Sequence, residues 1–455
     1  MLLVCFCLTG MAKAPKYVFY FIGDGMSLNQ VMGTQYFLKQ RNAAGALCFT
    51  SFPYTGLATT YSASSDVTDS AAGGTALACG VKTTNGAIGL AANLIDKPQS
   101  VAALAKEQGR RVGVATSVTL NHATPASFYA HQPSRNDYYE IGVQLAQSGY
   151  DFFGGGDFEE NVSRKDKEAP ELYDVAKDAG YQVLRGFDRF QKGHRNRKVI
   201  LIQEKDAAEK TLPYAIDATD ESLTLEQITT AAIDVLDNNK GFFLMVEGGK
   251  IDYAAHANDA AAVFHEVVDF DKAIRVAYDF YLQHPKETLI IVTADHETGG
   301  LTLGNGRYAL NFAALHAQRV SHVGFSRMLN QMRHETKDKV TWEQVKDALK
   351  ANFGFWDIIQ LDTADEEALH DEYQRSFATN KSVSMAKSLY YMDEPLSALA
   401  VRILDRIAMV SWPVGSHTAA YVPVFAVGNG AEHFTGQMDN TDIPKRIAEV
   451  AEYNK

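Results

Sequence analysis

The chain has 455 residues, of which 46% are hydrophobic, so it can bury a large core. Its formal net charge of −12 argues against nucleic acid as a bound partner and provides no basic surface for anionic membranes. Of its 4 cysteines, only Cys48 and Cys79 lie beyond the first 14 residues, which excludes a fold held together by a disulfide framework.

The first 14 residues resemble the remnant of a signal peptide. Residues 2–8 form a short apolar run, and residues 12–14 (Ala-Lys-Ala) have the small-x-small pattern of a cleavage site. The run is too short to cross a bilayer, so we expect no transmembrane segment. We expect export to the periplasm or secretion, with a lipid anchor on Cys5 or Cys7 as the alternative.

The first strand-like run, residues 17–22, leads into Gly23-Asp24-Gly25-Met26. Its uninterrupted apolar side chains are typical of a buried strand. Ligands in open α/β sheets gather beyond the carboxyl ends of the strands, so a site is expected at this end.

Residues 69–76, with the sequence Asp-Ser-Ala-Ala-Gly-Gly-Thr-Ala, follow as the next element. A serine at the start of a helix lies where backbone N–H groups and the helix dipole favour negative charge. This position suits a nucleophile that attacks phosphorus, and Ser70 is the candidate. The alternative is an ordinary N-cap serine at the start of a tightly packed helix.

An alternation of strands and helices continues to about residue 310. The runs 111–117, 150–153 and 198–202 fit parallel strands. Residues 224–227 have the capping-box sequence Thr-Leu-Glu-Gln, which predicts the start of a helix. The pattern indicates one large α/β domain with a mostly parallel sheet.

Two further apolar runs end in residues that can bind metal. Residues 241–246 lead into Glu247, and residues 288–293 lead into Asp295 and His296. The carboxyl ends of parallel strands meet at one edge of a sheet. We therefore expect these two ends and that of the first run to be neighbours in space.

Asp252 and His256 are four residues apart. This spacing places the carboxylate and the imidazole on one face of a helix, where both can bind one zinc ion. Residues 415–418 (Gly-Ser-His-Thr) supply a further histidine near the C-terminus, His417.

Residues 316–410 break the alternation and predict a helical insertion that lies over or beside the mouth of the site. Thr341 with Gln344 and Thr363 with Glu366 have capping-box spacing. The aromatic residues of this segment are expected to form a small core of its own, and they are Trp342, Phe353, Phe355 and Trp356.

Six separated motifs occur in the order found in alkaline phosphatases, and the chain resembles that family from residue 17 to about residue 435. The motifs are Gly-Asp-Gly-Met at 23–26, Asp-Ser-Ala-Ala at 69–72, Ala-Thr-Pro at 123–125, Val-Glu-Gly-Gly-x-Ile-Asp at 246–252, Thr-Ala-Asp-His at 293–296 and Ser-His-Thr at 416–418. The resemblance implies a three-layer α/β sandwich and a homodimer.

The resemblance also implies two Zn²⁺ ions and one Mg²⁺ ion per subunit. One zinc ion would be held by Asp252, His256 and His417. The other would be held by Asp24, Ser70, Asp295 and His296. Magnesium would be held by Asp24, Thr124 and Glu247.

The implied reaction is the hydrolysis of small phosphate monoesters to alcohol and inorganic phosphate. Ser70 would form a phosphoserine intermediate, and Arg135 would bind two phosphoryl oxygens. The alternatives are a phosphodiesterase or sulfatase of the same superfamily, or a protein that binds metal and phosphate without turnover.

Two positions vary among relatives, and both are expected near the metals. His122 is aspartate in some family members, and it is expected beside the magnesium site. Tyr253 follows Asp252 where relatives often carry lysine or histidine, and its side chain is expected to approach the phosphate. Either residue has a packing role as its alternative.

Overall fold

The computed structural model describes residues 13–40, 46–193, 198–204, 209–306, 308–337, 339–377, 386–387 and 392–454. Residues 1–12 of the predicted signal segment therefore lie outside the described residues. Within the described residues, no helix is long and apolar enough to cross a membrane. Cys48 and Cys79 are free thiols, and burial raises the pKa of Cys79 to about 12.

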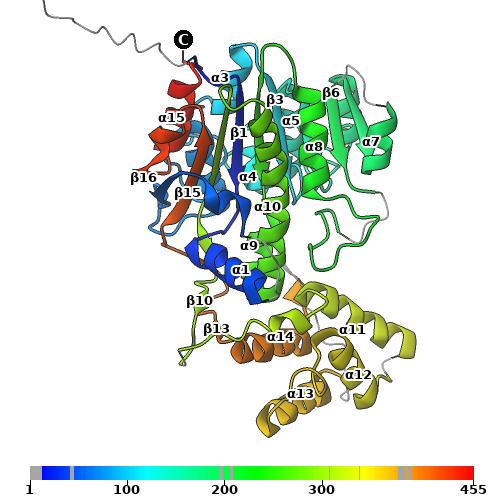
Figure 1. The fold of residues 1–455 in the computed structure, drawn as a ribbon. Coiled ribbons are helices and arrows are strands. Elements are labelled where there is room, and N and C mark those ends of the chain that lie inside the picture. The colour runs from blue at the N-terminus through cyan, green and yellow to red at the C-terminus, as the bar shows by residue number, and fades with distance from the viewer. Residues whose placement is uncertain are drawn as a thin grey trace, which may run out of the picture.

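A ten-stranded sheet forms the centre of the molecule (Figure 1). Strand β15 runs antiparallel to its neighbours β2 and β8, and the other neighbouring pairs are parallel, which confirms the predicted mostly parallel sheet. In spatial order the strands are β16 (Gly436–Asp439), β2 (Tyr54–Thr59), β15 (Val422–Gly428), β8 (Thr288–Thr293), β1 (Tyr17–Ile22), β7 (Phe242–Glu247), β3 (Arg111–Thr116), β4 (Phe152–Gly155), β6 (Lys198–Ile202) and β5 (Tyr181–Arg185).

The central strands β8, β1 and β7 are buried along their whole length, as expected for uninterrupted apolar runs covered on both faces. Their carboxyl ends are level, because Ile22 pairs with both Thr293 and Glu247. Strand β3 continues the row, since Thr116 pairs with Glu247. The expectation that these strand ends are neighbours is confirmed.

Helices cover both faces of the sheet, and this gives the three layers (Figure 1). Helices α1, α8 and α10 pack together on one face, and α2, α3 and α15 pack together on the other. The capping box predicted at residues 224–227 is present at the start of α8. The helices are α1 (Leu28–Gln40), α2 (Ser70–Cys79), α3 (Val101–Glu107), α4 (Ala123–Ala126), α5 (Tyr138–Gln147), α6 (Leu172–Asp178), α7 (Phe187–Gly193), α8 (Leu225–Leu236), α9 (Lys250–His256), α10 (Ala260–Gln283) and α15 (Asp442–Val450).

Four helices in the predicted insertion lie apart from the sheet, below α1 and α9 in Figure 1. They are α11 (His322–Thr336), α12 (Trp342–Phe353), α13 (Thr363–Ser376) and α14 (Pro395–Ile407). Phe353 and Phe355 are buried and stack, and Phe355 meets Trp356 edge to face, so these aromatics form a local core.

One of the two capping boxes predicted in this segment is wrong. Thr341 and Gln344 form theirs at the start of α12. At α13, however, Asp362 is the N-cap, and its carboxylate accepts a hydrogen bond from the backbone N–H of Asp365. Thr363 is therefore already the first residue of the helix, because the carboxylate before it satisfies the exposed N–H group.

Short strands connect the insertion to the sheet. Strand β10 (Thr302–Leu303) pairs with β13 (Val410–Ser411), and β9 (Glu297–Thr298) pairs with β14 (His417–Thr418). A third pair, β11 (Ala386–Lys387) and β12 (Met392–Asp393), lies within the insertion. The pairing of β9 with β14 brings His417 back to His296 after about a hundred residues of intervening chain.

Candidate metal centre

The row of strand ends brings acidic and imidazole groups into contact. His296 Nε2 lies 3.2 Å from Asp24 Oδ1 and 3.3 Å from Asp295 Oδ2. Thr124, in the short helix α4 beyond β3, donates a hydrogen bond from Oγ1 to Asp24 Oδ2 at 3.4 Å. Asp24, Thr124, Glu247, Asp295 and His296 are all buried.

A second group forms where α9 meets strand β14. His256 Nε2 lies 3.4 Å from Asp252 Oδ2, as the spacing of four residues predicts. His417 Nε2 lies 3.6 Å from Asp252 Oδ1 and 3.2 Å from His256 Nε2. The three side chains therefore lie together, and the triplet whose donor atoms all lie within 4.8 Å of one another at this place is Asp252, His296 and His417.

His256 and His417 are each oriented by a contact of the ring nitrogen Nδ1. His256 Nδ1 lies 2.8 Å from the carbonyl oxygen of Gly415, and His417 Nδ1 lies 2.8 Å from that of Thr68. A carbonyl oxygen accepts from an Nδ1–H group, which leaves each Nε2 with a free lone pair. This arrangement is typical of metal-ligating histidines.

Among the described residues, three triplets of side chains each have donor atoms that all lie within 4.8 Å of one another, close enough for each triplet to hold an ion. Asp24 and His296 each belong to two triplets, so the groups are contiguous. The triplets are Asp252, His296 and His417; Asp24, Asp295 and His296; and Asp24, His122 and Glu247.

Four buried carboxylate oxygens at the centre of these groups have no hydrogen-bond partner among the described residues. They are Asp24 Oδ1, Glu247 Oε1, Asp252 Oδ2 and Asp295 Oδ2. Burial, reinforced by Asp295, Asp252 and Glu247, raises the pKa of Asp24 well above its ordinary value. Such crowding of buried carboxylates is unfavourable unless cations compensate it, so the residues present fit a cluster of metal ions.

Ser70 is the first residue of α2 and lies beside this cluster. Its Oγ is 3.2 Å from His296 Nε2, and the side chain is buried. The interpretation of Ser70 as the N-cap is wrong, because Asp69 caps the helix by accepting a hydrogen bond from the N–H of Ala72 at 3.0 Å. The serine hydroxyl is therefore not used for capping.

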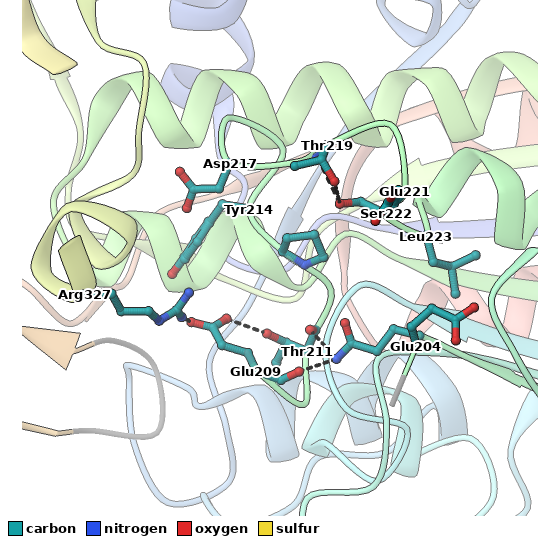
Figure 2. A pocket seen from close by; sticks show the side chains of 12 residues that line it. Glu204, Glu209, Thr211, Tyr214, Asp217, Thr219, Glu221, Ser222, Leu223 and Arg327 are labelled. Carbon is teal, nitrogen blue, oxygen red and sulfur yellow. Dashed lines mark hydrogen bonds and ion pairs between the residues drawn. The ribbon is translucent and has the colours of Figure 1, made fainter. Parts of the chain in front are cut away.

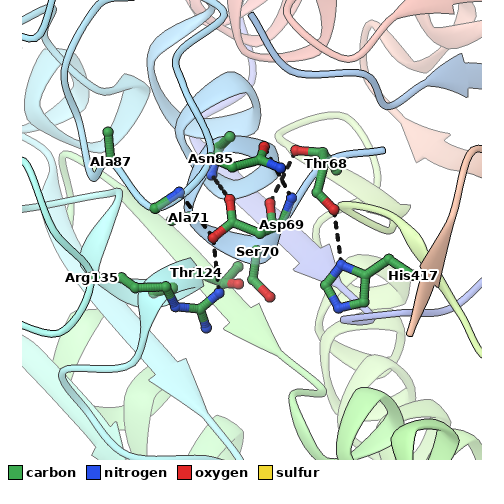
Figure 3. A network of polar contacts seen from close by, with 12 residues as sticks. Thr68, Asp69, Ser70, Ala71, Asn85, Ala87, Thr124, Arg135 and His417 are labelled. Atoms are coloured by element: carbon green, nitrogen blue, oxygen red, sulfur yellow. Dashed lines mark hydrogen bonds and ion pairs between the residues drawn. The ribbon is translucent and has the colours of Figure 1, made fainter. Parts of the chain in front are cut away.

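Arg135 reaches the same place from the loop before α5. Its Nη1 donates to Asp69 Oδ2 at 3.1 Å (Figure 3). Its Nη2 lies 3.1 Å from His122 Nε2. Asp69 Oδ2 also accepts a hydrogen bond from the N–H of Gly86 at 3.1 Å. Asp69 therefore caps α2 and orients the arginine beside Ser70.

Sequence reasoning missed Asp69 and two threonines. Thr298 donates to Asp252 Oδ1 at 2.5 Å, and Thr116 donates to Glu247 Oε2. Each could have been found by position. Asp69 immediately precedes the serine, Thr298 is two residues after His296, and Thr116 lies near the end of the predicted strand run 111–117.

The two variable positions lie side by side at the edge of the cluster. His122 is buried, and burial, reinforced by Arg135, lowers the pKa of its imidazole well below the ordinary value. The ring of Tyr253 is also buried and meets the His122 ring edge to face, with 5.8 Å between centroids. A neutral imidazole beside Asp24 and Glu247 can act as a metal ligand.

Known proteins match nearly the whole chain. The family model described as "Alkaline phosphatase" matches residues 15–162 and 152–453. Alkaline phosphatase 3 of Bacillus subtilis (strain 168) is 32% identical over 461 residues, which cover 96% of this chain and 89% of the relative.

Solved structures show the same fold. The cold-active alkaline phosphatase from a psychrophilic Shewanella species has a TM-score of 0.78 and 30% identity, with coverage of 96% of this chain and 99% of that chain. A variant of the TAB5 alkaline phosphatase, in which a histidine is replaced by glutamate and magnesium is bound in the M3 site, has a TM-score of 0.68 and 28% identity. The match covers 98% of this chain and 100% of that chain.

Proposed function

Since this chain belongs to the alkaline phosphatase family and is a metal-dependent phosphatase, we propose that it hydrolyses phosphate monoesters through a phosphoserine intermediate on Ser70. The observation that carries the proposal is the set of four carboxylate oxygens without a hydrogen-bond partner among the described residues, in a cluster that contacts the buried Ser70 hydroxyl through His296. A site that only bound phosphate would have no use for a serine in this position.

The donor sets divide between zinc and magnesium by their chemistry. Zinc favours imidazole and carboxylate ligands, whereas magnesium favours oxygen ligands. Asp252, His256 and His417 would hold one zinc ion, and Asp24, Ser70, Asp295 and His296 would hold the other. Asp24, Thr124 and Glu247 would hold magnesium. When bound, these ions lower the pKa of the serine hydroxyl and of water.

His122 adds a nitrogen donor to the proposed magnesium site. Its imidazole lies in the same triplet as Asp24 and Glu247, so a nitrogen donor adjoins oxygen donors. The related TAB5 alkaline phosphatase holds magnesium in its M3 site in a variant whose histidine is replaced by glutamate. We expect His122 to weaken magnesium binding relative to a carboxylate, because Mg²⁺ prefers oxygen ligands.

Arg135 and Asp69 prepare the phosphate site. The guanidinium offers a planar pair of N–H donors that matches two phosphoryl oxygens, and Asp69 fixes its orientation. Ser70 attacks phosphorus and forms the Ser70–O–P bond while the bond from phosphorus to the alcohol oxygen breaks. Water then breaks the bond to Ser70 and releases inorganic phosphate.

We also propose that residues 15–455 form one domain with a helical insertion at about 316–410, and that the chain is exported and forms a homodimer. The signal-like N-terminus supports export. Cell fractionation and light scattering of the purified protein test these two properties.

The experiment that tests the reaction is acid trapping of the enzyme during turnover of a ³²P-labelled aryl phosphate. Wild-type protein should yield labelled phosphoserine, and Ser70→Ala should yield none while it retains its metals. Ser127→Ala is a matched control, because Ser127 is a buried serine that packs near α2 and contacts Thr75 and Ala71. Label in Ser70→Ala at the wild-type level would assign the nucleophile to another residue.

A further inference from the structure

Lys250, the first residue of α9, carries a charge that is removed from solvent. Its side chain is 1% exposed, and its Nζ lies 3.1 Å from Glu209 Oε2 and 3.1 Å from Thr211 Oγ1. The same Nζ lies 3.5 Å from the ring centroid of Tyr214 and 5.3 Å from that of Tyr253. A buried ammonium needs such partners, because an unpaired charge in the interior is costly.

Glu209 binds a second cation from a distant part of the chain. Arg327 of α11 forms an ion pair with Glu209 Oε1 (Figure 2). The other carboxylate oxygen, Oε2, is the one that binds Lys250. One carboxylate therefore connects the helical insertion with the first residue of α9.

This connection matters because α9 is short and carries the ligands of one proposed zinc site. Asp252 and His256 lie two and six residues after Lys250. The backbone N–H of Lys250 donates to Ser117 Oγ at 3.0 Å, so its main chain and its side chain are both held. A displacement of Lys250 would move Asp252 on the same turn of the helix.

The start of α11 is fixed to the same side of the molecule. Asp217 accepts hydrogen bonds from Ser321 through its backbone N–H at 2.7 Å and its hydroxyl at 2.5 Å. Asp259, just after α9, accepts from the backbone N–H of His322 at 2.7 Å. Helix α11 is thus held firmly enough at its start for Arg327, less than two turns later, to keep Glu209 in place.

We propose that Arg327, Glu209 and Lys250 form a positioning network through which the helical insertion holds α9 and slows the loss of the cation bound by Asp252 and His256. The proposal rests on the proposed function, because it needs zinc at that site. The three residues touch neither the cation nor the phosphate, so they act only by positioning.

The test is the rate of zinc release from zinc-loaded protein into excess chelator, followed by the absorbance of a zinc-sensitive dye. Arg327→Met should accelerate release from one site about two- to fivefold, and Lys250→Met about five- to thirtyfold, as expected for coupled contacts. Lys250→Met leaves Glu209 paired with Arg327, so it buries no unpaired charge. The double variant should release zinc no faster than Lys250→Met alone, because both cations act through Glu209.

Arg406→Met is the matched control, because Arg406 pairs with Asp365 inside the insertion and does not contact Glu209. It should release zinc at the wild-type rate, and Arg327→Lys should restore a rate close to it. Equal release rates for wild type, Arg327→Met and Lys250→Met would overturn the proposal. If Arg327→Met unfolds, an unaltered rate in Lys250→Met alone overturns it. Wild-type protein that binds no zinc would instead refute the proposed function.

Discussion

Buried carboxylates of the metal centre and of the helical insertion differ in how far protein donors satisfy their oxygens. In the insertion, Glu394 accepts hydrogen bonds from Arg333 and from the backbone N–H groups of Leu396 and Ser397. Both oxygens of Asp365 accept from Arg406. Protein donors therefore satisfy these two groups. Asp405 of α14 is an exception, because it accepts from Trp412 through Oδ2 while Oδ1 has no hydrogen-bond partner among the described residues.

In the metal centre, by contrast, Asp24, Glu247, Asp252 and Asp295 each leave one buried oxygen without a hydrogen-bond partner among the described residues. The comparison teaches that burial and acidity alone do not identify a ligand. Several such oxygens gathered beside histidines leave a deficit that cations can fill, whereas a carboxylate whose two oxygens both have protein donors already has a structural role.

The largest expected effect is the loss of activity on chelation. Removal of metal should abolish turnover, zinc should restore most of it, and magnesium should add a further increment, because His256, His296 and His417 suit zinc far better than magnesium. Activity on an aryl phosphate is measured alongside metal content. Undiminished activity in metal-free protein would contradict the assignment of the metal-centre carboxylates as metal ligands.

Replacement of Arg135 should have the next largest effect. Loss of charge-assisted hydrogen bonds worth about 1.5–3 kcal/mol should lower monoester kcat/KM by about one to two powers of ten in Arg135→Ser. Diester hydrolysis should fall much less, because one phosphoryl oxygen of a diester carries a second organic group. Matched aryl monoester and diester substrates provide the measurement, and equal losses on both would make Arg135 a structural residue.

The neighbouring strand ends and the contact of Asp252 with His256 could be predicted from the sequence, because both depend on local patterns. Strands at 17–22, 241–246 and 288–293 and the pair Asp252 and His256 depend on local patterns, which sequence reports directly. The network of Lys250, Glu209 and Arg327 could not be predicted. Its members are distant in sequence, and nothing in their spacing indicates which charges will meet.

The N-cap residues of α2 and α13 also could not be selected from the sequence alone. Adjacent candidates such as Asp69 with Ser70, or Asp362 with Thr363, both fit an N-cap by residue type. The structure selects the aspartate in each case. At Ser70 this choice affects the site, because it frees the hydroxyl and gives Arg135 its partner.

Tyr253 should have a moderate effect on product binding. Tyr253 is an uncharged residue beside His122, so it should bind phosphate less tightly than a cation would. Tyr253→His or Tyr253→Lys should therefore lower the inhibition constant for inorganic phosphate about three- to tenfold. Competitive inhibition measured with an aryl phosphate checks this. If both variants keep the wild-type inhibition constant, Tyr253 serves only packing against His122.

Replacement of Asp365 should have the smallest effect on catalysis. Asp365→Asn weakens a pair whose arginine is half-exposed, so it should lower the free energy of unfolding by at most about 1 kcal/mol and leave kcat unchanged. Urea unfolding and steady-state kinetics supply the two values. A large loss of activity would show that carboxylates of the insertion also serve the site.

The metal content per chain of two matched variants tests most directly whether the unpartnered carboxylates of the metal centre bind metal ions. Zinc and magnesium are measured by mass spectrometry after gel filtration of wild type, Asp252→Asn and Asp365→Asn. The account predicts that Asp252→Asn loses one zinc ion per chain and that Asp365→Asn matches wild type. Unchanged zinc in Asp252→Asn would contradict the assignment of the unpartnered carboxylates as metal ligands.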